Sequence, residues 1–352
     1  MSRISTVNGE QIESFGDVAR YEDNLDATYL SNLKIAYNLL MDKCSYKYDI
    51  IPLIVTTDQH RRYSESQLKG VYRFISDKVD MQSISKVLNL GDMTDDGTIA
   101  ELTNVLDCVN LLPLEKQVNV WGNHDYGNDA SQEQAWVREY FKNDHTARYG
   151  GGNGYFVAYD NIYNVKYVCL NDWEHVGSAE GVHYYGSVST EQIEWAIKEL
   201  SKNDGYDVIL CSHNAWVSTG VTWYDQDNNR WVENYDRSTE SQWEHESDVL
   251  ADWLQLLSYR KNKKSGTFTD CLGVTHSYDF SDCENDLIMS LHGHWHDDFY
   301  KHLENSITMY EFDCFKELYA VHFCYIDRKN KKFGVIKVQQ GWGNKQWEID
   351  IN

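Results

Sequence analysis

The sequence predicts an α/β layered fold with a mixed sheet system. Two observations predict it. In the first half of the chain, short apolar runs alternate with amphipathic helical segments, and in the second half short alternating runs add antiparallel strands. The chain has 352 residues, of which 41% are hydrophobic and 25% are charged. This is the composition of a globular protein, and the length suffices for a large core.

Short apolar runs bounded by polar clusters predict the strands. They fall at residues 51–56, 86–90, 117–121, 155–159, 165–170, 207–211 and 286–291, and residues 307–351 read as β-rich. Helical patterns predict helices at residues 23–44, 64–79, 98–111, 189–200 and 247–259. Asp96 is a possible N-cap of the third helix, and Ser189 with Gln192 forms a capping box that opens the fourth.

The order of the predicted strands and helices also predicts the domain boundaries. We expect residues 1–49 to form an N-terminal helical extension, residues 50–340 the main domain, and residues 341–352 a C-terminal tail. Residues 214–285, which are polar and rich in tryptophan, interrupt the rhythm as an insertion. This insertion is either a cap that shapes the ligand pocket or a lateral subdomain with a small core of its own.

The net charge of the chain limits which classes of ligand it can bind. The chain carries 55 acidic and 32 basic residues, a formal net charge of −23. Such a chain is repelled by phosphate backbones at long range, which excludes nucleic-acid binding through a general basic surface. A phosphate ligand therefore needs a local source of positive charge, such as metal ions.

Cysteine usage and hydropathy bear on the compartment. None of the eight cysteines is spaced as C-x-x-C, so we expect reduced thiols in a cytosol-like compartment. No segment is apolar enough to span a bilayer, and residues 1–30 lack the apolar region of a secretory signal. The expected location is cytoplasmic, without a membrane partner.

Five of the predicted strands end in His, Asp or Asn. The clusters are Asp58-Gln-His60, Gly91-Asp92, Gly122-Asn-His-Asp125, Ser212-His213 and Gly293-His-Trp-His296. Singly, each is weak, because a polar turn after a strand is common. Together they gather carboxylate, amide and imidazole ligands where α/β sheets bind ligands, at the carboxyl ends of strands. Mixed N and O ligands without thiolate suit Mn, Fe, Zn or Mg.

These five clusters, in this order, resemble the signature blocks of the calcineurin-like metallophosphoesterases over roughly residues 50–325. The resemblance implies a four-layer αββα sandwich of two mixed sheets flanked by helices, with residues 50–340 as the catalytic domain. It implies a phosphoester hydrolase, a phosphodiesterase or nucleotide-type phosphatase, in which a hydroxide bound by two divalent ions attacks phosphorus. Among these ions we favour Mn.

The resemblance also implies a role for each residue. The expected ligands are Asp58, His60 and His296 for the first ion, Asn123, His213 and His294 for the second, and Asp92 for both. His124 would assist the leaving group, and Asp125 would orient His124. Asp95 stands where the purple acid phosphatase branch has an iron-binding tyrosine, which argues against a ferric site.

Other residues are open to two interpretations. Arg61 and Arg62 follow His60 and would either clamp a phosphate or face solvent. Asp172, His175 and His183 follow a predicted strand and are candidates for the lining of the substrate cleft.

Two alternative functions compete with the hydrolase. A catalytically silent scaffold on the same fold would be expected to lack ligands or His124, and none is missing here. A nuclease acting on nucleic-acid ends would need a basic groove, for instance one lined by Arg61, Arg62 and Lys69. The expected partner is a phosphoester substrate; nucleic acid enters only as a substrate, and the sequence names no protein partner.

Overall fold

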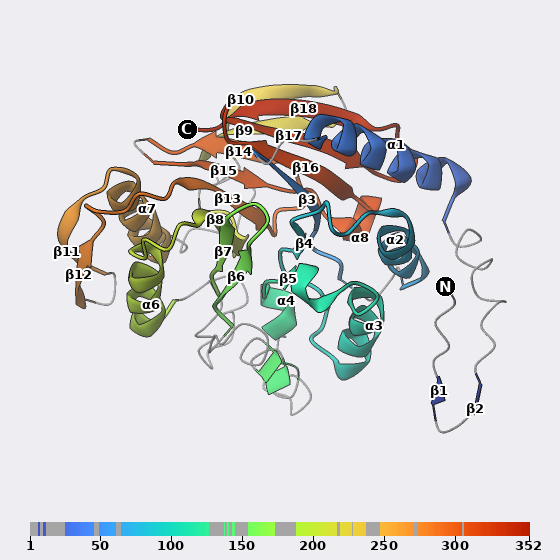
Figure 1. Cartoon of the computed structure of the whole chain (residues 1–352), viewed down its shortest axis with the longest axis horizontal. Helices are drawn as coiled ribbons and strands as arrows, with labels where there is room; N and C mark the ends of the chain where they lie inside the picture. Colours follow the sequence, from blue (N-terminus) through green and yellow to red (C-terminus); the bar gives the residue numbers. More distant parts are fainter. Residues whose placement is uncertain are drawn as a thin grey trace.

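The computed structural model describes most of the chain. The described residues are 6–7, 10–11, 25–45, 49–60, 65–126, 137, 139–140, 143–144, 154–172, 188–216, 219–226, 228–236, 247–270, 273–304 and 306–352. They form a mixed α/β fold built on two large sheets, as predicted (Figure 1). A separate two-stranded sheet, β1 (Thr6–Val7) with β2 (Glu10–Gln11), lies near the N-terminus.

The first large sheet has six strands and carries the first three ligand clusters. Its strands, in spatial order, are β18 (Lys345–Asp350), β17 (Lys332–Val338), β16 (Val321–Asp327), β3 (Ile50–Thr56), β4 (Lys86–Asn89) and β5 (Gln117–Asn119). β3, β4 and β5 are parallel, whereas β16 to β18 are antiparallel. Every residue of β3 is buried, which explains its continuous apolar run, because both faces of this sheet are covered.

The second large sheet has eight strands. They are, in spatial order, β10 (Arg230–Asp236), β9 (Thr219–Asp225), β14 (Phe299–His302), β15 (Thr308–Glu311), β13 (Leu287–Gly293), β8 (Asp207–Asn214), β7 (Val165–Cys169) and β6 (Phe156–Asp160). β7, β8, β13 and β15 are parallel to one another, so the carboxyl ends of β8 and β13 lie on the same side. This places Ser212-His213 beside Gly293-His-Trp-His296.

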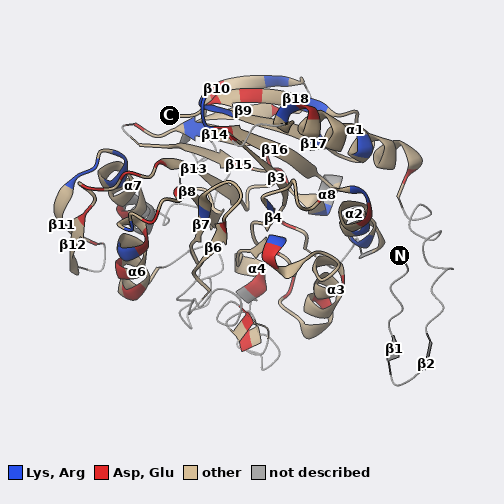
Figure 2. Cartoon of the chain, viewed as in Figure 1, with Lys and Arg blue, Asp and Glu red and all other residues tan. Residues whose placement is uncertain are grey.

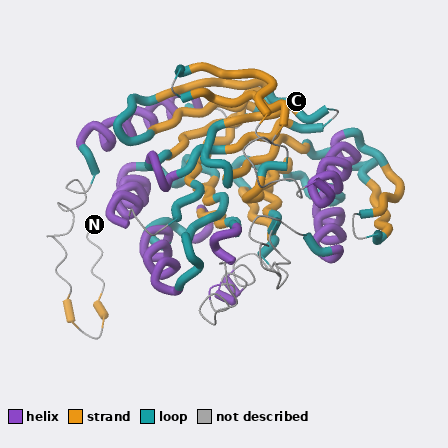
Figure 3. Tube along the Cα trace, turned by 180° about the vertical axis from the view of Figure 1, so that it is seen from behind, coloured by secondary structure: helices purple, strands orange, loops and turns teal. Residues whose placement is uncertain are grey.

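The layers follow the order helix, sheet, sheet, helix (Figures 1 and 3). The helices on the six-stranded sheet are α1 (Ala27–Cys44), α2 (Glu65–Lys78) and α3 (Ile99–Val109). Those on the eight-stranded sheet are α6 (Thr190–Leu200) and α7 (Ser247–Lys261). The inner faces of the sheets share one core, in which Leu53 and Val55 of β3 join the same cluster as Met289 and Leu291 of β13. Three short helical turns lie in the connections: η2 (Leu114–Lys116) between α3 and β5, α4 (Asn123–Tyr126) after β5, and α8 (Phe315–Leu318) between β15 and β16.

The N-cap of α6 is the predicted one, whereas the N-cap of α3 is not. Ser189 caps α6, and its side chain accepts a hydrogen bond from the backbone of Gln192, as expected. Asp96 does not cap α3. The cap is Thr98, which forms a reciprocal capping box with Glu101, and the Glu101 carboxylate also accepts the Asp96 N–H. A threonine three residues before a glutamate satisfies two backbone donors, so it outcompetes the aspartate.

The tryptophan-rich insertion is built into the eight-stranded sheet where the structure describes it. β9 and β10 extend this sheet beyond β14, and the hairpin of β11 (Ser265–Thr269) and β12 (Thr275–Asp279) follows α7. Trp216 and Trp253 are buried in the core cluster that also contains residues of α6. These described tryptophans therefore share the core of the main domain.

The two ends of the predicted domain also contact the sheets. Residues 341–352, expected to be a tail, contain β18, which pairs with β17 along its whole length. In the predicted N-terminal extension, α1 packs on β3, β16 and β17, and the Tyr29 hydroxyl donates to the Tyr319 carbonyl at 2.5 Å. The domain boundaries themselves stay a prediction. Among the described residues, no helix combines the length and hydropathy needed to cross a bilayer.

Candidate metal centre

The seven predicted ligands come from both sheets and meet at one place. Asp58 and His60 follow β3, Asp92 follows β4, Asn123 follows β5, His213 is the last residue but one of β8, and His294 and His296 follow β13. All are buried except His294 and His296, which are half-buried. Their donor atoms form two groups, each within 4.8 Å: Asp58, His60 and His296 in one, and Asp92, His213 and His294 in the other.

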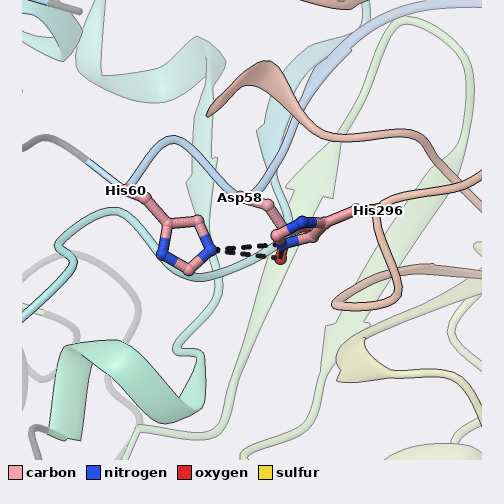
Figure 4. Close-up of side chains that lie close together, drawn as sticks. All are labelled: Asp58, His60 and His296. Atoms are coloured by element: carbon pink, nitrogen blue, oxygen red, sulfur yellow. Dashed lines mark hydrogen bonds and ion pairs between the residues drawn. The ribbon is translucent and has the colours of Figure 1, made fainter. Parts of the chain in front are cut away.

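The first group is compact (Figure 4). His60 Nε2 lies 3.2 Å from His296 Nε2, and Asp58 Oδ1 lies 3.3 Å from His296 Nε2 and 3.9 Å from His60 Nε2. Asp58 and His60 belong to the six-stranded sheet, whereas His296 belongs to the eight-stranded one. The group therefore spans the seam between the sheets.

The second group centres on His213. Its Nε2 lies 3.1 Å from His294 Nδ1, 3.3 Å from Asp92 Oδ2 and 3.1 Å from Asn123 Oδ1. The carboxylate of Asp92 also reaches the first group, because the same oxygen lies 3.4 Å from His60 Nε2. Asp92 thus stands between the two groups, where one carboxylate can bridge two ions.

The contacts of the imidazole rings prepare them to bind cations. His60 Nδ1 lies 2.9 Å from Asp95 Oδ1, and His213 Nδ1 lies 2.7 Å from the Leu90 carbonyl. Because both oxygens accept hydrogen bonds, each Nδ1 carries the proton and donates it. The Nε2 atoms are then left to face the carboxylates with their lone pairs, as in metal sites where an outer acceptor fixes the ring.

The residues fit a pair of cations. Asp58 Oδ1 is buried and makes no hydrogen bond, although three imidazole nitrogens lie within 4.0 Å of it. Burial alone would lower the pKa of His213, yet Asp92 and Asp58 raise it to about 9. The pocket therefore favours positive charge, and the donors are the N and O atoms that borderline divalent metals accept.

The ligand loops have an unusual backbone. Five of the seven ligands adopt left-handed φ angles between 38° and 91°; they are Asp58, His60, Asp92, His294 and His296. Non-glycine residues avoid this region, and such strain gathers at functional sites. Neighbouring glycines make room for the ligands. A Cβ on Gly91 would lie 2.3 Å from His213 Nδ1, and one on Gly293 would lie 2.6 Å from Asp58 Oδ2.

Hydrogen bonds between loops hold this backbone. Asp58 Oδ2 accepts the N–H of His294 at 2.9 Å, and Asp92 Oδ1 accepts the N–H of His124 at 2.9 Å. Each carboxylate ligand thus uses one oxygen for a neighbouring loop and turns the other toward the cluster. Glu311 of β15 accepts the N–H of Trp295, between the two histidines of the last cluster.

His124 lies at the open side of the site, where its side chain is 30% exposed. Its Nε2 is 4.0 Å from Asp92 Oδ2, and its Nδ1 donates to the backbone carbonyl of Asp95 at 2.6 Å. Asp95 therefore orients the His124 ring. The expected contact between Asp125 and this ring is absent, although the structure describes both residues.

The Asp125 carboxylate instead joins two loops. One oxygen accepts the N–H of Thr94 at 2.9 Å, and the other accepts the N–H of Gly122 at 3.0 Å. Burial, with Asp92 nearby, raises the pKa of Asp125 to about 6. Asp125 thus holds the two loops around His124 together. Its carboxylate is hydrogen-bonded to backbone N–H groups and does not contact the His124 ring.

From the sequence, Asp95 has no predicted role in the site, but the structure gives it one. Its carboxylate orients His60 and its carbonyl orients His124, and Lys316 Nζ of α8 lies 3.5 Å from Asp95 Oδ1. The hydrogen bond from His60 and the charge of Lys316 hold the pKa of Asp95 well below its usual range. The spacing Gly91-Asp-Met-Thr-Asp95 was a usable signal, since it puts a second carboxylate on the loop that carries Asp92.

Of the other candidates, four lie outside the described residues and Asp172 has another role. Arg61, Arg62, His175 and His183 lie outside the described residues. Asp172 is buried, and its carboxylate accepts the N–H of Asn214 at 3.1 Å, so it supports the His213 loop. His292 is buried in the core: its Nδ1 lies 2.9 Å from Ser212 Oγ, and its ring packs edge-on against Trp216.

Comparison with known proteins identifies the fold and the family. No curated protein matches the sequence. Among solved structures, a dimetal phosphatase from Danio rerio superimposes with a TM-score of 0.52 and 12% identity, over 84% of this chain and 98% of that one. The purple acid phosphatase PPD1 of yellow lupin gives 0.45 and 10%, over 86% of this chain and 54% of that one. Such identities show the fold alone.

The family is identified by a comparison of the sequence with family models. A family model of the calcineurin-like phosphoesterases matches residues 51–298, which is most of the chain and includes every cluster described above. The protein is therefore a member of the calcineurin-like phosphoesterase family, a metal-dependent hydrolase of phosphoester bonds.

Proposed function

We propose that the chain hydrolyses phosphodiesters or nucleotide-type phosphomonoesters at a centre of two divalent ions. The expected ligand set is unchanged: Asp58, His60 and His296 for one ion, Asn123, His213 and His294 for the other, and Asp92 for both. One observation carries this assignment. A single oxygen, Asp92 Oδ2, lies 3.3 Å from His213 Nε2 and 3.4 Å from His60 Nε2, between the two groups.

When bound, the ions would supply a nucleophile from water at neutral pH and would neutralise the phosphoryl oxygens. Manganese is the metal we favour, because the donor set combines carboxylate and amide oxygens with imidazoles and contains no thiolate.

His124 is the proposed general acid. Its Nδ1 is fixed by the Asp95 carbonyl, so its Nε2 faces Asp92 Oδ2 at 4.0 Å and the open side of the site. A group held there can donate a proton to the departing oxygen, which needs a donor on the side opposite to attack. Asp95 and Asp125 are positioning residues in this proposal, the first through the His124 ring and the second through the loops around it.

The alternatives have less support. A silent scaffold gains no support, since all seven ligands and His124 are described and converge. For a nuclease, the described candidate is Lys69, which lies on α2 among residues of both signs (Figure 2). The net charge of −23 also opposes salt-driven binding of nucleic acid.

We also propose that the protein works in a reducing compartment such as the cytoplasm. The seven cysteines that the structure describes are buried thiols. Location of a tagged chain in cells, and thiol titration of the purified protein, test this proposal.

A metal-by-substrate panel tests the proposed function. The apo chain is loaded with Mn²⁺, Fe²⁺, Zn²⁺ or Mg²⁺ and assayed on a generic monoester, a generic diester, cyclic nucleotides and single-stranded DNA. We expect hydrolysis with Mn²⁺ and a fall of about 100- to 10,000-fold in turnover for His124→Ala, the usual range for a lost general acid. Metal content should stay at two ions per chain. Wild-type turnover in His124→Ala on every substrate would refute the role of His124.

A further inference from the structure

A buried charged cluster begins two residues after His296, the last ligand of the first group along the chain. Asp298 follows His296 by two residues and has no exposed surface. Its Oδ2 lies 2.8 Å from Lys337 Nζ, and its Oδ1 accepts a hydrogen bond from the Tyr310 hydroxyl at 3.0 Å and lies 3.2 Å from His322 Nε2. Lys337, on β17, is also fully buried as a side chain.

The cluster connects the two sheets. Lys337 and His322 belong to β17 and β16 of the six-stranded sheet, whereas Asp298 leads into β14 of the eight-stranded sheet. The short segment from His296 to Asp298 is therefore tied to the opposite sheet immediately after its metal ligand. The position of His296 relative to Asp58 then depends on this tie.

Lys337 has a second carboxylate partner. Its Nζ also bonds Asp313, which lies between β15 and α8. Just beyond, the backbone N–H groups of Phe315 and Lys316 donate to the carbonyls of Thr57 and Asp58 at 2.9 and 3.0 Å. One ammonium group thus joins the segment that carries His296 to the segment that holds Asp58.

A buried charged cluster of this kind contributes little to stability, which indicates that its role is to fix geometry. Burying an ion pair in a core usually gives little net stability over apolar residues, and removing one partner is destabilising. The two carboxylates outweigh burial and raise the pKa of Lys337, so the ammonium stays charged. A charged centre with several fixed partners holds its neighbours in one arrangement.

From these contacts we infer that Lys337, with Asp298 and Asp313, positions His296 against Asp58 and so sets the affinity of the first of the two metal sites. The second site, with Asn123, His213 and His294, has a separate tie, because the Leu90 carbonyl holds the His213 ring at 2.7 Å. The inference rests on the ligand assignment proposed above. It predicts an unequal effect on the two sites.

The test uses Asp298→Asn in the full chain. This change removes one of the two carboxylates on Lys337 and leaves the Lys337–Asp313 pair charge-balanced, so we expect the variant to fold. The apo protein is titrated with Mn²⁺ while free Mn²⁺ is counted by electron paramagnetic resonance. We expect one site to lose about 10- to 100-fold in affinity, the usual effect of an outer-sphere change, and the other to keep its affinity.

Two further variants identify the site and control for stability. His296→Ala removes a ligand of the first site, and Asp298→Asn added to it should cause no further loss if both act there. Asp204→Asn is the control for the loss of a carboxylate from a buried lysine, because it breaks the Lys166–Asp204 pair at 2.9 Å, which belongs to no ligand loop. It should lower the melting temperature and leave both affinities unchanged.

The possible outcomes separate the two proposals. If the wild-type chain binds fewer than two Mn²⁺ ions, the dinuclear assignment fails. If it binds two, and Asp298→Asn weakens both sites equally or weakens neither, the positioning role of Lys337 and Asp298 is wrong. If Asp298→Asn fails to fold, Asp313→Asn removes the other carboxylate and is judged by the same criteria.

Discussion

The small cradle around Asp92 allows a quantitative prediction. Gly122 precedes Asn123, and a Cβ at this position would lie 2.1 Å from Asp92 Oδ1 and 2.4 Å from Asp92 N. Ordinary contact begins at 3.4 Å. Gly122→Ala would thus displace the carboxylate oxygen by about 1.3 Å and the backbone nitrogen by about 1.0 Å, since the packed core gives little room.

The expected cost follows from that displacement. A misplacement of about 1 Å in a catalytic group lowers the rate about 100-fold, and overpacking a core costs about 1–3 kcal/mol of stability. We expect Gly122→Ala to fold, to lose about 100-fold in kcat, and to bind both ions more weakly, because Asp92 stands between the two groups.

The assay measures kcat on a chromogenic phosphoester with saturating metal, together with ions per chain and the melting temperature. Gly343→Ala is the matched control, because a Cβ there meets nothing within 4 Å. Wild-type kcat and full metal content in Gly122→Ala would refute the reasoning, as would an equal loss in Gly343→Ala.

Two further predictions concern charge. Asp92→Asn should weaken both metal sites together, since one oxygen faces both groups; elemental analysis that finds only one ion lost, with the other unaffected, would contradict the bridging role. Burial lowers the pKa of His292 from 6.5 to about 3, so the folded chain keeps this ring neutral while the unfolded chain protonates it. This contribution to stability is present above about pH 6.5 and is lost as the pH falls toward 3. We expect the free energy of unfolding of the apo protein to fall over that window and His292→Gln to flatten the fall, as measured by urea unfolding at several pH values; parallel curves for both proteins would count against it.

The convergence of the proposed ligands was predictable because the chemistry of each residue agrees with its position in the strand. Asp58, Asp92 and His213 each come at or just after the end of an apolar strand, and parallel strands deliver their carboxyl ends to one edge. The α/β class was predictable from the alternation of strand and helix in residues 50–126, whereas the four-layer order was expected only from the family resemblance.

Other features depend on contacts that no local pattern encodes. The family resemblance implied that Asp125 orients His124, but its carboxylate accepts the backbone N–H groups of Thr94 and Gly122 instead. β9 pairs with β14, and their sequence positions are separated by α7 and four strands, so no local signal predicts the extended sheet. The Lys337 cluster likewise unites residues that are far apart in the sequence.

The division of the ligands between two sheets has a consequence for folding. The His294 N–H and the Asp58 carboxylate, 236 positions apart in the chain, meet only after both sheets have docked. Contacts of such long range form late and slowly. On the proposed ligand assignment, the cluster is therefore complete only in the finished molecule, since even the six-stranded sheet needs β16 to β18 from the end of the chain.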